Sequence, residues 1–438
     1  MTGKLLLQLD GTRLLLANHA PDTFPFLADP AHGRARTALH ATLARLLFQA
    51  DTPAKFRAFV APQTAALVGM AAASRGGSDP GALRAAVPAA AVAGLMRDLR
   101  GIAAATNSRR TYGLLFDWLH PAHTPALRAA LAAWAPDPAV CVPALKFYSE
   151  FVLNKAQRLT FDASSPNGIL LFREVGAALV AFAAPALASP LPADAYVGRY
   201  KGIWVCLQAL TRALSGNYVN FAVFELYGDR ALADALDAAL RLALSIPLAD
   251  VLAHKKVAKA YFGLLDVLAH GHAPALAARD GPTFAAAVAA LDAGLKCADA
   301  SVSSQCAAAV DSLAGFYFRG AAADPPHPAA GALAAHLAAA PTLFPGLLAT
   351  LFDVALFDDC PNQWSLSRPM LSLVLVNEGV YEALTARLVD AQPASERPRL
   401  AAALAKLMDG VARSLEPKNR DKFTQNLTLV RHEIRAKP

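Results

Sequence analysis

The chain has 438 residues, of which 55% are hydrophobic and 17% are charged, and its formal net charge at pH 7 is +7. Globular proteins carry about 25% charged and about 45–50% apolar residues, so this composition excludes a disordered chain. Alanine supplies much of the apolar excess and few runs are rich in β-branched residues, so the sequence predicts an all-α fold.

Taken in order, the predicted helices alternate with short turns. The sequence predicts an amphipathic helix over residues 32–48. Asp51-Thr52-Pro53 is expected to end it and to start a second helix with a kink at Pro62. Further breaks are expected at residues 74–81, 106–108, 121, 136–138, 164–168, 189–192, 215–217, 227–229, 245–247, 270–272, 281–282, 323–328, 341, 358–362, 369 and 393. Such spacing fits a helical array.

Residues 146–182 give the clearest pattern, a helix, a tight turn and a second helix. Apolar side chains recur at helical spacing from Leu145 to Leu159, which predicts a helix across that stretch. Ser165 is then expected to cap the next helix, with Pro166 at its first position. Two such helices are too apolar to stand alone and require neighbours on both sides.

Helix pairs of this kind recur about every 40–60 residues, which favours HEAT-like repeats. We therefore expect a helical-repeat solenoid (an α-α superhelix) that continues through residues 1–438 as a single domain. Residues 175–193 and 325–352 carry no Asp, Glu, Lys or Arg, and their length alone would nominate membrane spans. Their prolines and high alanine content favour buried helices instead, so no membrane partner is expected.

The search for chemistry in the sequence yields weak candidates. Asp358-Asp359 could hold Mg²⁺, but no further carboxylate follows one turn later. His270-Gly271-His272 lacks a third zinc ligand, and Ser303, Ser304 and Cys306 have no paired histidine. The five cysteines are scattered, which is typical of reduced, buried thiols. We expect no catalytic residue, no cofactor and no metal, and therefore no enzyme activity.

Basic residues gather near the C-terminus, where residues 396–438 hold ten Lys or Arg against five Asp or Glu. Two interpretations remain open, a solvated helix face and a surface that contacts an acidic protein. The alternating signs argue against direct nucleic-acid binding. The candidate protein-contact residues are Lys418, Arg420, Lys422, Arg431 and Arg435.

Several long, irregular segments occur in the same order as in a known family: MRDLRG (96–101), TYGLLFDWLHP (111–121), LNKAQRLTFDASSPNGILLFRE (153–174), YKGI (200–203), LSGNYVNFAVFELYGD (214–229), LSIP (244–247), LFDDCPNQWSLSRPMLSLVLVNE (356–378) and KNRDKFTQNLTLVRHEI (418–434). Across nearly the whole chain they resemble the C-terminal part of exportins, which are members of the importin-β (karyopherin) superfamily.

The resemblance implies a HEAT-repeat nuclear transport receptor that binds protein cargo, responds to Ran-GTP and touches phenylalanine–glycine nucleoporins at the nuclear pore. It would shuttle between nucleus and cytoplasm. Members of this superfamily carry an N-terminal importin-β-type domain that makes the main Ran contact, and no segment of the chain matches it. Ran binding is therefore expected to be weak or absent in this part. The alternative is a HEAT-repeat protein-binding scaffold without Ran-dependent transport.

Overall fold

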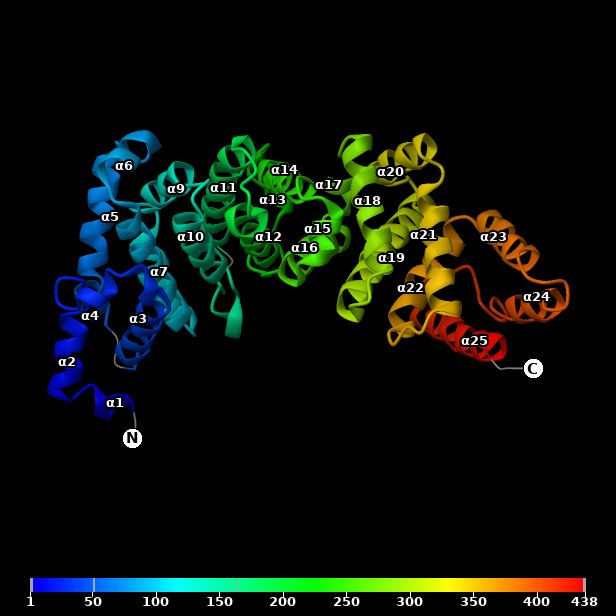
Figure 1. Cartoon of the computed structure of the whole chain (residues 1–438), viewed down its shortest axis with the longest axis horizontal. Helices are drawn as coiled ribbons and strands as arrows, with labels where there is room; N and C mark the ends of the chain where they lie inside the picture. The colour runs from blue at the N-terminus through cyan, green and yellow to red at the C-terminus, as the bar shows by residue number, and fades with distance from the viewer. Residues whose placement is uncertain (1–2, 50–51, 163, 436–438) are drawn as a thin grey trace. The chain divides into compact units, whose positions relative to one another are not determined.

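The computed structural model describes residues 3–49, 52–162 and 164–435, and these contain helices and turns but no β-strand. The expected all-α fold is therefore confirmed. Contacts between Cα atoms divide the chain into two compact units, Met1–Ile246 and Pro247–Pro438. Figure 1 colours the helices of both units in chain order.

In unit 1 the helices form two layers. The first layer contains α3 (Gly33–Leu47), α7 (Ala89–Ala105), α10 (Pro138–Phe151) and α12 (Lys201–Leu214), each packed against the next. The second layer contains α5 (Ala61–Ala73), α6 (Pro80–Ala86), α9 (Thr124–Ala133), α11 (Asn167–Ala188) and α14 (Ala231–Leu244). Around them lie α1 (Gly3–Leu6), α2 (Asp10–Ala17), α4 (Pro53–Phe59), α8 (Arg109–Leu119) and α13 (Ala222–Leu226). Successive helix pairs thus stack along one direction, as in HEAT repeats.

Unit 2 repeats this pattern. Its first layer runs through α16 (Lys255–Gly271), α19 (Ala300–Ala322), α22 (Gln363–Val376) and α25 (Pro417–Arg435). Its second layer contains α18 (Gly281–Leu295), α20 (Pro328–Ala339), α21 (Leu343–Phe352) and α23 (Glu378–Asp390), and α24 (Arg397–Ala405) lies between α23 and α25. Two short helices, α15 (Leu248–Ala253) and α17 (Ala273–Ala277), pack on α16. The HEAT-like repeat fold is confirmed in each unit, whereas one continuous solenoid over residues 1–438 stays a prediction.

Many of the predicted turns lie directly before a helix. The side chains of their residues accept hydrogen bonds from backbone N–H groups in the first turn of that helix. Thr52 accepts a hydrogen bond from the backbone N–H of Lys55, and Asp229 accepts one from Ala231. Ser108 forms a reciprocal capping box with Thr111 at the start of α8. Such caps satisfy the backbone donors that a helix leaves unpaired at its N-terminus. The expected kink at Pro62 is also present, since α4 and α5 meet at a bend of 63°.

Two sequence-based expectations about helix ends are wrong. Pro369 does not break a helix, because it lies inside α22. The helix expected to continue to Leu159 ends at Phe151 as α10, and the chain then turns through a short 3-10 segment, Lys155–Gln157. The predicted cap of the following helix is displaced by one residue: α11 begins at Asn167 with Pro166 at the N-cap position, and Ser165 Oγ accepts a hydrogen bond from Asn167 N–H just before the helix.

Arg158 explains why α10 ends at Phe151. Its side chain is fully buried, and its guanidinium group donates to the carbonyl oxygens of Leu153 and Glu150 near the end of α10. The same group donates to the carbonyl oxygens of Ala103 and Thr106 at 2.6 and 2.8 Å, at the end of α7. One buried cation thus satisfies the unpaired C-terminal carbonyl groups of two neighbouring helices, where the helix dipoles also favour positive charge.

The residues around Arg158 extend this connection, and we call residues 153–159 the joint. Lys155 Nζ donates to the carbonyl oxygen of Ala104 at 2.7 Å and pairs with Glu150 at 3.0 Å. Asn154 Nδ2 donates to the carbonyl oxygen of Gly216, in the turn after α12. The joint therefore links the C-terminal ends of α7, α10 and α12, which are three consecutive helices of one layer.

Close packing of α3 against α7 depends on small residues at their crossing. A Cβ atom added to Gly101 would lie 2.6 Å from the carbonyl oxygen of Thr37, so only glycine permits this approach. Next to this contact, the buried side chains of Arg36 and Asp98 pair through two hydrogen bonds of 2.5 and 2.6 Å. Because both charges are paired, the α3–α7 interface can bury them.

Helix α11 is long and apolar enough to cross a membrane by length and composition, and half of its most apolar window is buried inside the fold. If each bent pair counted as one span, α4 with α5 and α20 with the helix after Pro341 would also qualify. In unit 1, α11 packs between α9 and α14, and Phe172 and Leu179 are buried there. Contacts within the protein therefore account for the apolar face of α11.

The joint gives a first prediction. Replacing Arg158 with alanine leaves several buried carbonyl groups without donors, so the free energy of unfolding should fall by about 3–5 kcal/mol. Urea denaturation followed by circular dichroism measures this change. The control is Arg109→Ala, which removes an exposed ion pair with Asp162 and should cost less than about 1 kcal/mol. Equal losses in the two variants would contradict the role of Arg158.

Candidate interaction surfaces

The predicted basic cluster lies on α25, and the structure separates its members by environment. Lys418 and Lys422 are exposed. The side chain of Arg420 is only 14% exposed and forms an ion pair with Asp311 of α19 at 2.9 Å. Arg420 therefore joins α25 to α19 within the same layer, and Asp311 already compensates its charge.

Arg431 and Arg435 contact the segment between α21 and α22. Arg431 donates to the carbonyl oxygen of Asp358 at 3.0 Å, and Arg435 donates to that of Phe357 at 3.0 Å. Both guanidinium groups also lie within 4.0 Å of the exposed carboxylate of Asp359. These two arginines hold the segment after α21 against α25. The exposed Lys418 and Lys422 are therefore the members of the cluster whose charge is most available to a partner.

Asp358 and Asp359, the acidic pair considered for Mg²⁺, thus contact arginine side chains instead. Asp359 faces Arg431 and Arg435, while the backbone of Asp358 accepts from Arg431. Within the part of the chain that the structure describes, no group of three or more His, Cys, Asp or Glu side chains could hold a metal ion.

The other candidate groups also take structural roles. His270 is exposed and His272 is buried, and burial lowers the pKa of His272. Ser303 donates to the carbonyl oxygen of Leu295, and Asn362 donates to both Ser303 and Ser304. Burial raises the pKa of the Cys306 thiol, which disfavours the reactive thiolate. None of these groups is arranged for nucleophilic chemistry.

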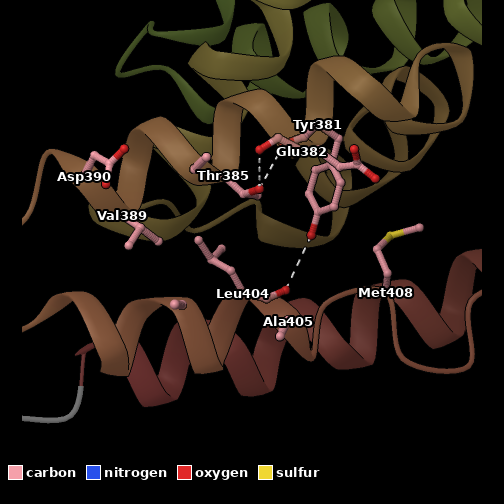
Figure 2. A pocket seen from close by; sticks show the side chains of 10 residues that line it. Tyr381, Glu382, Thr385, Val389, Asp390, Leu404, Ala405 and Met408 are labelled. Atoms are coloured by element: carbon pink, nitrogen blue, oxygen red, sulfur yellow. Dashed lines mark hydrogen bonds between the residues drawn. The ribbon is translucent and has the colours of Figure 1, made fainter.

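An apolar groove of about 520 Å³ lies between α23 and α24 (Figure 2). Its walls carry Val389 and Tyr381 from α23, Leu404 and Ala405 from α24, and Met408 beyond the end of α24. The Tyr381 hydroxyl crosses the groove and donates to the carbonyl oxygen of Leu404 at 3.4 Å. This volume is within the range of pockets that bind small ligands or single side chains, about 300–1,000 Å³.

Two features define the chemistry of this groove. Burial raises the pKa of Tyr381 further, to about 12. A tyrosine hydroxyl is protonated at neutral pH, and here it donates to the carbonyl oxygen of Leu404. Glu382 and Asp390 lie at its rim on exposed positions of α23. The groove thus combines an apolar floor with the Tyr381 hydroxyl and an acidic edge. No sequence motif marked it, because its two walls come from separate helices.

The two classes of residue in the α25 cluster give a second prediction. Arg420→Gln should lower the free energy of unfolding by about 2 kcal/mol, because a charged hydrogen-bonded pair is broken. Lys418→Gln with Lys422→Gln should change it by less than about 0.5 kcal/mol.

If the lysines meet an acidic protein surface, the double variant should also lower the affinity for that partner. The loss should shrink as salt rises and the Debye length falls from about 10 to about 3 Å. A salt-independent affinity would contradict the contact.

Comparison with known proteins finds relatives of this chain that are named as exportins and as Ran-binding proteins. No protein-family model matches it. It is 36% identical over 446 residues to exportin-7-B of Xenopus laevis, 35% identical to Ran-binding protein 17 of Mus musculus, and 33% identical to Ran-binding protein 16 of Drosophila melanogaster. Each match covers 98% of this chain and 40 or 41% of the relative. The chain is therefore a homologue of a C-terminal part of exportin-7 and the Ran-binding proteins 16 and 17.

Proposed function

We propose that this chain is part of a nuclear transport receptor of the exportin type, which binds protein cargo under the control of Ran-GTP. The observation that carries the proposal is similarity over 98% of the chain to relatives named for export and for binding Ran. The stacked helix pairs of both units support it. Such a receptor would shuttle between nucleus and cytoplasm and would contact the nuclear pore on the way.

The fold offers a physical basis for this activity. In a stack of helix pairs each pair contacts only its neighbours, so small shifts at many interfaces can change the curvature of the binding surface. A ligand that binds one curvature better shifts the population toward it. Ran-GTP and cargo could in this way bind one conformation together.

A HEAT-repeat scaffold without Ran-dependent transport is the second candidate. The chain spans about 40% of the length of its relatives, so their Ran contacts could lie outside the matched part. Their names denote exportins and Ran-binding proteins, which are names of binding proteins. The choice therefore lies between two kinds of binding protein.

The response to the nucleotide on Ran separates these candidates. We expect the protein at its natural length to bind Ran loaded with a GTP analogue at least about tenfold more tightly than Ran-GDP. That ratio corresponds to about 1.4 kcal/mol, within the usual range of coupling energies. Surface plasmon resonance with immobilised Ran measures both affinities. Equal affinities, with no fluorescence at the nuclear rim of permeabilised cells, would favour the scaffold.

We further propose that the groove between α23 and α24 receives the phenylalanine side chain of a phenylalanine–glycine nucleoporin repeat. The support is its apolar floor, formed by Val389, Leu404, Ala405 and Met408. An aromatic side chain buries about 150–250 Å² and gains most from an enclosed apolar site. Glycine on either side would let the peptide backbone pass close to the helices.

This groove can be tested through the methyl group of Met408. Addition of a phenylalanine–glycine peptide should shift its NMR signal in the protein labelled with ¹³C-methyl methionine. Ala405→Glu should abolish the shift, because a carboxylate in an apolar site costs free energy unless it is paired. Ala402→Glu is the matched control, since Ala402 is an exposed residue of α24 outside the groove. A Met408 signal that does not respond in the unmodified protein would rule the site out.

A further inference from the structure

A second groove, of about 660 Å³, lies in unit 1 and is lined by residues of α3, α7 and α10 and by the first residue of α12. Figure 1 labels these four helices. Each helix contributes residues from one face. Arg34, Ala38 and Ala41 come from α3, and Arg97 and Arg100 come from α7. The spacings of three, four and seven residues place these side chains on single helical stripes that face the groove. Lys146 of α10 and Lys201 of α12 complete the lining cations, and we call this the basic groove.

The charge of the basic groove is strongly one-sided. Five cations line it, and Glu150 is the one carboxylate among the lining residues. Glu150 is already engaged by Lys155 at 3.0 Å and by Arg158 at 3.5 Å. In contrast, no side chain in the described ranges forms an ion pair with Arg34, Arg97, Arg100 or Lys201. The groove therefore presents positive charge that the fold does not neutralise.

These cations are held together by the packing of the helices. The guanidinium group of Arg97 lies over Gly33, where an added Cβ atom would come within 2.3 Å of Arg97 Cζ. Burial, followed by the like charges of Arg100 and Arg36, lowers the pKa of Arg97. A cluster of like charges raises the energy of the folded protein unless an anion binds. The basic groove therefore has the geometry and charge of a site that binds anionic groups.

We propose that the basic groove binds an acidic, extended segment of a partner protein, whose carboxylates pair with Arg97, Arg100, Arg34 and Lys201. Arginine suits this role because its planar guanidinium group can bind a carboxylate through two parallel hydrogen bonds. Between the cations, Ala38, Ala41 and Val142 form an apolar floor that fits small side chains between acidic ones. The inference does not depend on the proposed transport function, since it concerns only the chemistry of this surface.

The lining favours a peptide over a nucleic acid. Single-stranded nucleic acids bind proteins through a basic track together with aromatic side chains on which the bases stack. None of the residues that line the basic groove is aromatic. Carboxylates on a flexible peptide need no such platform, so an acidic protein segment is the better match.

The test measures binding of a fluorescein-labelled peptide of alternating glutamate and alanine by fluorescence anisotropy. The unmodified chain should bind it, and affinity should fall as salt rises. Arg97→Gln with Arg100→Gln should lower the affinity at least about tenfold, because each hydrogen bond between charged groups contributes more than that factor. The control is Arg75→Gln with Arg230→Gln, which removes two exposed cations outside the groove. This pair should change the affinity less than about twofold.

A second variant distinguishes a loss of binding from a folding defect at the α3–α7 interface. Arg34→Gln with Lys201→Gln removes two cations at the edges of the groove, and it should also weaken peptide binding while leaving the circular dichroism melting curve unchanged. No peptide binding by the unmodified chain, or equal loss in groove and control variants, would overturn the proposal. Tighter binding of oligo-dT, with the same dependence on Arg97 and Arg100, would reassign the groove to nucleic acid. The assay contains no Ran or nucleoporin, so either result leaves the transport proposal untouched.

Discussion

The buried guanidinium group of Arg158 is the interaction on which unit 1 depends most. It occupies the point where α7 and α10 end, and each helix leaves C-terminal carbonyl groups that need donors. Tyr112 supports the same point, because its hydroxyl donates to the carbonyl oxygen of Phe151 and its ring lies 5.5 Å from the Arg158 guanidinium. Consecutive repeats are thus joined by specific polar contacts as well as by apolar packing.

The joint also shapes the surface beside it. Ala104 and Glu150 line the basic groove, and both contact the joint through Lys155. Lys155 and Arg158 pair with Glu150, so this carboxylate does not neutralise Arg34, Arg97 or Arg100 across the groove. The contact that holds α7 beside α10 therefore also sets the positive charge of the basic groove.

The local elements of this fold could be predicted from sequence, whereas the sites that depend on distant residues could not. Caps such as Thr52 and Asp229 act on residues next to them, so turn patterns located most helix starts. The stretch after Phe151 was misread because its residues are good helix formers. The backbone there adopts positive φ at Ala156 and Gln157, which is costly for residues other than glycine and which contacts with distant residues, such as those of Arg158 and Lys155, accompany. Likewise, no local pattern showed that Arg420 would pair with Asp311 or that Arg34 and Arg97 would share a groove.

Hydrogen–deuterium exchange tests the central role of the joint most directly. Backbone amides in a helix exchange slowly only while that part of the structure stays closed. We expect Arg158→Ala to speed exchange in the last turns of both α7 and α10, while the distant α14 keeps its protection. Faster exchange confined to residues 153–159, with both helix ends unchanged, would show that Arg158 does not hold consecutive repeats together.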